Sequence, residues 1–325
     1  MKIKTCLFAL LLLLAACQQD TKPPGNGQPV TKDPKVDLPD LPVPDFSAEN
    51  AFAYVEKQLS FGPRVPNTPA HAACADWLME EFAAHGAIVS SQQAVVTAHD
   101  GKQLNLQNII ASFQPEKKQR IMLSAHWDTR PVADQDKERQ REPIPGANDG
   151  GSGVAVLLEI ARHLGQTNPY IGVDIFLWDG EDYGVSEVAD SYCLGSQYWA
   201  RNPHIPNYRA MYGINLDMVG AKDAFFPKEG QSLRFAPSVV EKVWDTAARL
   251  GYGNYFSTMA SEGIIDDHLY LNMIAGIPYI DIIHQPGGKG FFDAWHTHDD
   301  DIDIISPETL KAVGQTVLAV VYGEK

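Results

Sequence analysis

Between residues 46 and 325, short apolar runs alternate with longer segments in which apolar residues recur at helical spacing. Five apolar runs predict strands, over 107–113, 120–126, 173–178, 211–218 and 279–283. Several are almost continuously apolar, which is typical of strands buried on both faces. Six segments predict helices, over 47–59, 69–85, 154–164, 237–250, 267–275 and 307–321. Strands that alternate with helices predict a single α/β domain, with a mixed, mostly parallel sheet and helices on both faces.

The first 16 residues have the pattern of a secretory signal peptide. Lys2 and Lys4 precede an apolar run over 7–14 that is too short to span a bilayer. The run ends in Leu-Ala-Ala-Cys, which resembles a bacterial lipobox in which Cys17 is acylated and becomes the mature N-terminus. The alternative is an ordinary signal peptide cleaved nearby. We expect a lipoprotein of the bacterial cell envelope that faces the periplasm, held to the membrane by its lipid anchor only.

Residues 17–45 have the composition of a tether. The segment contains seven prolines and two glycines but almost no large apolar side chains. Such a segment cannot bury enough apolar surface to offset the entropy lost on ordering. We therefore expect an extended tether that leads to one catalytic domain over 46–325.

The charge balance excludes one class of partner. With 26 Lys and Arg against 41 Asp and Glu, the formal net charge is −15, and the sequence has no basic run. Binding to a phosphate backbone requires a basic surface, so a nucleic-acid partner is not expected. The acidic segment 299–303 is expected to be a solvated loop.

Two of the four cysteines have an expected fate at the N-terminus: Cys6 leaves with the signal peptide and Cys17 carries the lipid. Cys74 and Cys193 remain, far apart in the sequence. In an oxidising compartment they can form a disulfide. Two buried free thiols are the interpretation that we favour.

Acidic and histidine side chains follow four of the predicted strands. They are His126 and Asp128, Asp179 to Asp182, Asp217 and His296, with Asp149 in the glycine-rich segment 148–153 between two strands. The carboxyl ends of parallel strands meet at one edge of a sheet, where the like charges need a cation or shared protons. Histidine with carboxylates is a ligand set suited to catalytic zinc. In the Glu181-Asp182 pair, one carboxylate can bind the metal while the other shuttles a proton.

These segments together resemble the zinc aminopeptidase superfamily. The motifs H-x-D, N-D-G-G-S-G, D-G-E-[ED], L-D-M-[VI]-G and H-T-x-x-D occur in the order of that family across 120–300. Within it, the chain is most similar to the animal-type glutaminyl cyclases, which also occur in bacteria. Three features favour them: an Asp-Asp-His segment at 266–268, Trp295 directly before the last motif histidine, and Gly195 thirteen residues after Asp182.

The resemblance implies an acyltransferase that converts the N-terminal glutamine of peptides or proteins to pyroglutamate and releases ammonia. It implies one zinc ion per chain and leaves the oligomeric state open, with a monomer favoured. The residues that it implies are the zinc ligands Asp149, Asp182 and His296, the general acid/base Glu181, the proton-sharing residues Asp217 and Asp266, and the pocket wall Trp295.

The chain departs from the cyclase pattern in three respects, one of which is the absence of the animal disulfide beside the metal, where Ala125 and Val154 stand. Asp182 stands where the family usually has glutamate. A second pocket tryptophan of the animal enzymes aligns with Glu187, so another aromatic side chain must form that wall; Tyr183, Phe225 and Phe226 are the candidates.

A two-zinc aminopeptidase is the alternative function. In that case His126 and Asp217 hold a second metal, bridged to the first through Asp149, and the two metals activate a water for peptide hydrolysis.

Overall fold

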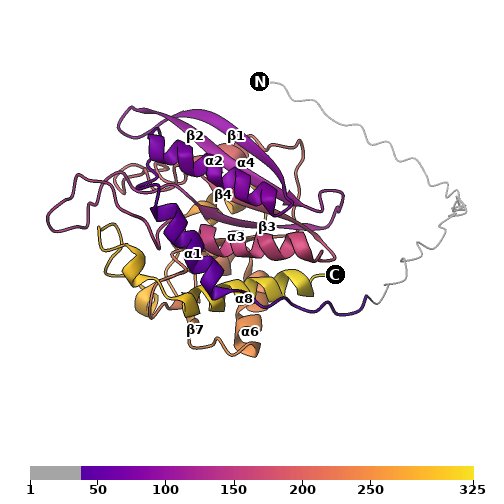
Figure 1. Ribbon diagram of the computed structural model, residues 1–325. Coiled ribbons are helices and arrows are strands. Elements are labelled where there is room, and N and C mark those ends of the chain that lie inside the picture. Colours follow the sequence, from indigo (N-terminus) through magenta and orange to yellow (C-terminus); the bar gives the residue numbers. More distant parts are fainter. Residues whose placement is uncertain (1–37) are drawn as a thin grey trace, which may run out of the picture. The chain divides into compact units, whose positions relative to one another are not determined.

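A six-stranded mixed sheet forms the centre of the structure, a computed structural model that describes residues 38–325 (Figure 1). In space the strands follow the order β1-β2-β4-β3-β5-β8. The pairs β4–β3, β3–β5 and β5–β8 are parallel, and β1–β2 and β2–β4 are antiparallel. The strands are β1 (Ile88–Thr97), β2 (Gln103–Phe113), β3 (Arg120–His126), β4 (Gly172–Trp178), β5 (Gly213–Asp217) and β8 (Tyr279–Ile283), and a separate parallel pair is formed by β6 (Phe226–Lys228) and β7 (Phe256–Ala260). The predicted α/β class with a mostly parallel sheet is confirmed.

Helices cover both faces of this sheet. The helices are α1 (Ala48–Leu59), α2 (Pro69–Ala84), α3 (Gly151–Gln166), α4 (Leu194–Arg201), α5 (Gly230–Phe235), α6 (Pro237–Arg249), α7 (Asp267–Tyr270) and α8 (Pro307–Gly323), with a π-helical turn over Leu271–Ala275 and 3₁₀ turns over Pro286–Gly288 and Ile302–Ile304. Along β2, Ile109 and Ala111 pack in the apolar cluster that includes α1, α2, α3 and α8, whereas Ile110 packs with Trp199 of α4. Alternate residues of one strand thus face different helix layers, as a doubly covered sheet requires. Figure 1 shows α1, α3 and α8 together on one face.

Five elements were absent from the sequence-based prediction: the edge strand β1, the helices α4 and α5, and the strands β6 and β7. The edge strand β1 has the polar centre Ser-Ser-Gln-Gln and is exposed along most of its length, so it lacks the apolar run that identified the inner strands. The helix α4 has only eight residues. The segment 267–275, predicted as one helix, is a short α-helix followed by the π-helical turn.

The compact unit spans Asp40–Lys325. It includes the last residues of the predicted tether, because Leu41 packs against the core and the carbonyl of Pro44 accepts a hydrogen bond from Gln315. The predicted signal peptide, the acylated Cys17 and the tether up to residue 37 lie outside the described residues. Within residues 38–325, no helix is long and apolar enough to cross a membrane. Both Cys74 and Cys193 are buried free thiols, as we favoured.

Candidate active site

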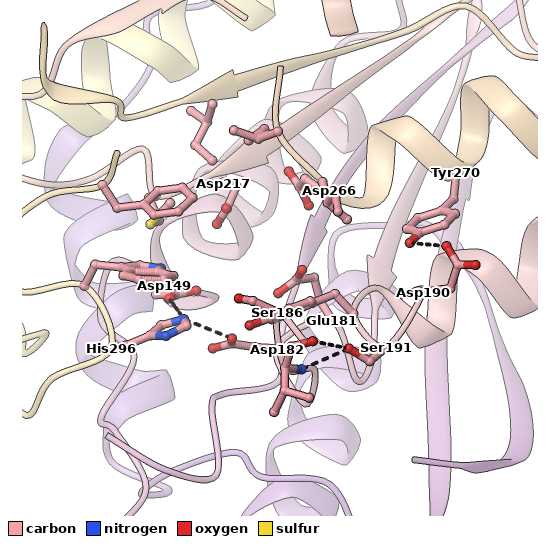
Figure 2. Close-up of a pocket in the computed structure, with 18 of the residues that line it drawn as sticks. Asp149, Glu181, Asp182, Ser186, Asp190, Ser191, Asp217, Asp266, Tyr270 and His296 are labelled. Atoms are coloured by element: carbon pink, nitrogen blue, oxygen red, sulfur yellow. Dashed lines mark hydrogen bonds and ion pairs between the residues drawn. The ribbon is translucent and has the colours of Figure 1, made fainter. Parts of the chain in front are cut away.

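A cavity of about 320 Å³ opens at the carboxyl edge of the parallel strands (Figure 2). All seven residues that the sequence assigned to the site line it: Asp149, Glu181, Asp182, Asp217, Asp266, Trp295 and His296. They come from the segments that follow β3, β4 and β5, from the start of α7 and from the loop after β8. The convergence predicted from the strand ends therefore occurs.

Asp149, Asp182 and His296 form a group that fits a metal ion. One ligand atom from each lies within 4.8 Å of the other two. The Nε2 atom of His296 is 3.2 Å from Asp182 Oδ1 and 3.8 Å from Asp149 Oδ2. All three side chains are buried, and Asp182 Oδ2 has no hydrogen-bond partner among the described residues. Two carboxylates and an imidazole with an unpaired oxygen are a donor set for zinc that leaves a coordination position open.

Two charged neighbours orient these ligands. Asp134 Oδ1 lies 3.1 Å from His296 Nδ1, which leaves Nε2 directed at the carboxylates. Burial alone would lower the pKa of His296, but Asp182, Asp134 and Asp149 together raise it to about 9. A metal cation at Nε2 would take the place of that proton. On the other side, Arg130 Nη1 donates to the backbone carbonyl and to Oδ1 of Asp182, at 3.0 and 3.3 Å.

Two buried aspartates hold the backbone of the ligand segments. Asp128 accepts hydrogen bonds from the amides of Glu181 and Asp182, at 3.1 and 3.3 Å. Asp300 accepts from the amides of Asn148 and Asp149, at 2.8 and 3.0 Å. The prediction of a solvated acidic loop was wrong for Asp300, which has no exposed surface and whose pKa is raised to about 8 by burial and by Asp149. Asp300 is the last residue of the H-T-x-x-D motif, but the motif does not indicate which backbone amides its carboxylate binds.

Glycine is required where Asp149 meets α3. Gly150 is the N-cap of that helix and has a φ of 86°, a left-handed conformation that favours glycine. A Cβ atom at this position would lie 2.5 Å from the carbonyl oxygen of Asp128. The glycine therefore allows the ligand Asp149 to approach the end of β3.

Glu181 faces the metal ligands on one side and a group of carboxyls on the other. Its Oε1 accepts a hydrogen bond from Cys193 Sγ at 3.2 Å, and one oxygen each of Glu181 and Asp266 lie within 4.8 Å of each other and of that sulfur. Burial, followed by Asp182, Asp266 and Asp267, raises the pKa of Glu181 well above its usual value, against the opposing effect of His126. Glu181 thus holds a proton more readily than a free glutamate, as a general acid/base requires.

Asp217 shares this character. Burial, Asp266 and Asp149 raise its pKa to about 7, although His126 opposes the shift. Neighbouring carboxyls of this kind titrate together and share protons.

The ligands of the alternative two-metal arrangement also lie together. His126 Nε2 is 3.1 Å from Asp149 Oδ1 and 3.2 Å from Asp217 Oδ1. Burial would lower the pKa of His126, but hydrogen bonds to Asp128, Asp149 and Asp217 raise it well above its usual value. One ligand atom from each of His126, Asp149 and Asp217 lies within 4.8 Å of the other two, so these residues form a second group that fits a metal ion and shares Asp149 with the first.

Aromatic side chains form the wall of the cavity beside the metal group. The Trp295 ring stacks on His296 and on Phe291, with ring centroids 3.6 and 4.4 Å apart. Tyr192 and Tyr270 also line the cavity. The second wall residue was predicted to be Tyr183, Phe225 or Phe226, and this prediction was wrong, because none of the three lines the cavity. Tyr183 and Phe226 are buried in other apolar clusters. Sequence spacing could not identify Phe291, which reaches the cavity only through the loop after β8.

Known proteins resemble this chain in sequence and in structure. The model of "Peptidase family M28" matches residues 108–321. A glutaminyl cyclase from Bacteroides thetaiotaomicron, solved with N-acetylhistamine bound, is 50% identical with a TM-score of 0.85. A Zn-dependent exopeptidase from Parabacteroides distasonis is 54% identical with a TM-score of 0.85. Each match covers 87% of this chain and 100% of the solved chain.

Curated relatives are more distant. The glutaminyl-peptide cyclotransferase of Bos taurus is 24% identical over 233 residues, which are 62% of this chain and 62% of the bovine protein. This chain spans only 31%, 44% and 62% of the length of the first three curated relatives that it matches.

Proposed function

Because the chain belongs to peptidase family M28, we propose that it is a zinc-dependent glutaminyl-peptide cyclotransferase. The enzyme converts the N-terminal glutamine of peptides and proteins to pyroglutamate and releases ammonia. The observation that carries the proposal is the position of Glu181 in the cavity, directly beside the ligand Asp182 and within 4.8 Å of the Asp266 carboxyl. The glutaminyl cyclase that is 50% identical supports it.

Asp149, Asp182 and His296 would hold the zinc ion. Bound there, zinc acts as a Lewis acid that polarises the carbonyl of the glutamine side chain.

Glu181 performs the proton transfers. The α-amine nitrogen of the substrate bonds to the side-chain amide carbon, and the proton that it loses passes to Glu181. The bond from that carbon to the amide nitrogen then breaks, and Glu181 returns the proton to the departing ammonia. Asp266 acts directly on Glu181 and keeps it able to exchange this proton, and Asp217 acts on Asp266 in turn. Trp295 and Phe291 form the wall against which the glutamine side chain folds back on its own amine.

The second candidate function is the two-zinc aminopeptidase, favoured by the proximity of His126, Asp149 and Asp217. The Parabacteroides exopeptidase carries a name of that class. Cyclisation remains the better proposal, because the glutaminyl cyclases from Bacteroides thetaiotaomicron and Tannerella forsythia are 50% and 52% identical and match along their whole length.

One substrate separates the two functions. With glutamine β-naphthylamide, a cyclase releases ammonia and leaves the naphthylamide attached, whereas an aminopeptidase releases β-naphthylamine. We expect ammonia as the product. Release of β-naphthylamine without ammonia would establish the aminopeptidase instead.

We also propose that the enzyme works at the periplasmic side of the bacterial envelope, anchored by acylated Cys17 through the tether 17–45. Its partners there are peptides and proteins with N-terminal glutamine. The lipobox pattern in the sequence supports this. Labelling cells with a fatty acid should label the wild-type chain and not Cys17→Ser; labelling of both would refute the anchor.

A further inference from the structure

A row of polar side chains crosses the buried centre of the sheet behind Asp266. Ser124 of β3 pairs in register with Asn215 of β5, and Asn215 pairs with Asp281 of β8. None of the three has exposed surface, and each lies in an otherwise apolar part of its strand. Polar groups buried in central strands cost free energy unless they are hydrogen-bonded. A continuous row of them across the sheet therefore indicates a specific role.

The hydrogen bonds of the row run in one direction. The hydroxyl of Tyr279 donates to Ser124 Oγ at 2.9 Å, and Ser124 Oγ donates to Asn215 Oδ1 at 2.6 Å. Because its oxygen receives the serine hydroxyl, Asn215 directs its Nδ2 the other way. That nitrogen donates to Asp266 Oδ2 at 2.8 Å and to Asp281 Oδ1 at 3.4 Å. The row therefore ends on a carboxyl that lines the cavity.

Asp266 accepts hydrogen bonds on both oxygens. Oδ1 accepts the amide of Asp267 at 2.5 Å, as the N-cap of α7, and Oδ2 accepts from Asn215. Its other ionisable neighbours are Glu181, Cys193 and Asp217 on the cavity side, Asp267 beside it, and Asp281 and His268 behind.

The charges behind Asp266 are balanced by a second group. His268 Nε2 lies 3.0 Å from Glu229 Oε2, and its Nδ1 lies 3.8 to 3.9 Å from Asp281 Oδ2 and Asp266 Oδ2. Burial, then Asp266, Asp217 and Glu229, raises the pKa of Asp281 well above its usual value. Burial acts against ionisation of Glu229, but the hydrogen bond from His268 lowers its pKa to about 2. The raised pKa of Asp281 favours its protonated form, whereas the lowered pKa of Glu229 favours its ionised form.

We propose that Ser124, Asn215 and Asp281 are positioning residues for Asp266. The row turns the Asp266 carboxyl toward Glu181 and fixes it as a hydrogen-bond acceptor at the wall of the cavity. The inference rests on the proposed function, because Glu181 is given its role there. Within residues 38–325, no hydrogen bond or ion pair joins the three residues to Asp149, Asp182 or His296. Loss of the row should therefore change turnover and not zinc content.

Asn215→Asp tests the row with a side chain of the same shape that lacks both N–H donors. We expect kcat to fall by roughly tenfold or more, the pH–rate profile to shift, and KM to change by less than about twofold. Zinc content should stay at the wild-type value. A folded Asn215→Asp enzyme with wild-type kcat and pH profile would overturn the proposal.

A milder variant covers the case in which Asn215→Asp does not fold. Tyr279→Phe removes only the hydroxyl at the far end of the row, and it should lower kcat and shift the pH–rate profile in the same direction. The matched control is Tyr208→Phe, which removes a buried hydroxyl of the same apolar cluster that donates to Asp174 instead. Its kcat and pH profile should be unchanged. Equal effects of the two variants would reduce the row to a structural role and refute the proposal.

An infrared measurement is independent of turnover. The protonated carboxyl of Asp281 should give a carbonyl band in the wild-type protein that disappears in Asp281→Asn and moves in Asn215→Asp. If the wild-type enzyme failed to cyclise glutamine, the proposed function would be refuted. The band would still show whether the hydrogen-bonded row is formed. Absence of the band in the wild-type protein would overturn the row even with full cyclase activity.

Discussion

Replacing Glu181 by glutamine removes one proton carrier and little else. The glutamine has the same length, its oxygen can still accept the hydrogen bond from Cys193 Sγ, and the backbone amide at 181 still donates to Asp128. The adjacent ligand Asp182 is unchanged. The variant should therefore keep its fold, its zinc and its affinity for substrate.

The expected loss is the contribution of general acid–base catalysis. A positioned group of this kind contributes about 10²–10⁴-fold, which corresponds to roughly 2.7–5.4 kcal/mol at about 1.36 kcal/mol per tenfold. Asp266 is a poorer proton carrier than Glu181, because each of its oxygens already accepts a hydrogen bond, from Asn215 and from the amide of Asp267. We therefore expect kcat to fall by about this factor with KM nearly unchanged.

The assay is steady-state release of ammonia from a peptide with N-terminal glutamine, together with the zinc content of each variant. Glu187→Gln is the matched control, since Glu187 is an exposed glutamate in the same loop. It should behave like the wild type. If Glu181→Gln kept a kcat within about threefold of the wild type with full zinc, Glu181 would not be the acid/base and the mechanism would be wrong.

Three further changes test other parts of the site and fold. His296→Ala should lose zinc and activity together, because two carboxylates alone bind zinc poorly; zinc bound at wild-type occupancy, measured by elemental analysis, would contradict this. Asp266→Asn should lower kcat/KM and alter its pH profile far more than Asp301→Asn, and equal losses would remove Asp266 from the site. Glu159 is buried and accepts a hydrogen bond from the Ser47 amide at the start of α1. Burial opposes its ionisation, but Arg162 and then His163 lower its pKa from 4.5 to about 2, so its stabilisation is complete above pH 4.5 and is lost as pH falls toward 2. Glu159→Gln should thus lower the free energy of unfolding by roughly 1–3 kcal/mol at neutral pH, with a deficit that shrinks in acid; a deficit that does not depend on pH would refute the charge argument.

Much of the fold was readable from the sequence because the inner strands are apolar on both faces. The predictions for β3 and β8 matched the observed bounds, and the side chains that follow these strands converged as expected. The edge strand β1 lacks this apolar pattern, because most of its side chains are exposed. Its polar centre is typical of a loop.

Contacts between distant segments could not be derived from spacing alone. Asp300 was read as solvated among its acidic neighbours, yet its carboxylate satisfies two backbone amides 151 and 152 positions away. The cavity wall depends on the path of the loop after β8, which has no periodicity to interpret. The row of Ser124, Asn215 and Asp281 shows the same limit: each is one polar residue within an apolar strand, and only the register of the sheet brings them side by side.

The central claim is that the site cyclises N-terminal glutamine without using water as a nucleophile. The most direct test is to incubate the wild-type enzyme with a glutamine-initiated peptide in water labelled with oxygen-18 and to weigh the products by mass spectrometry. We predict a peptide of unchanged length that has lost one ammonia and contains no label. A shortened peptide accompanied by labelled free glutamine, or a full-length peptide with a labelled glutamate at its N-terminus, would contradict the account.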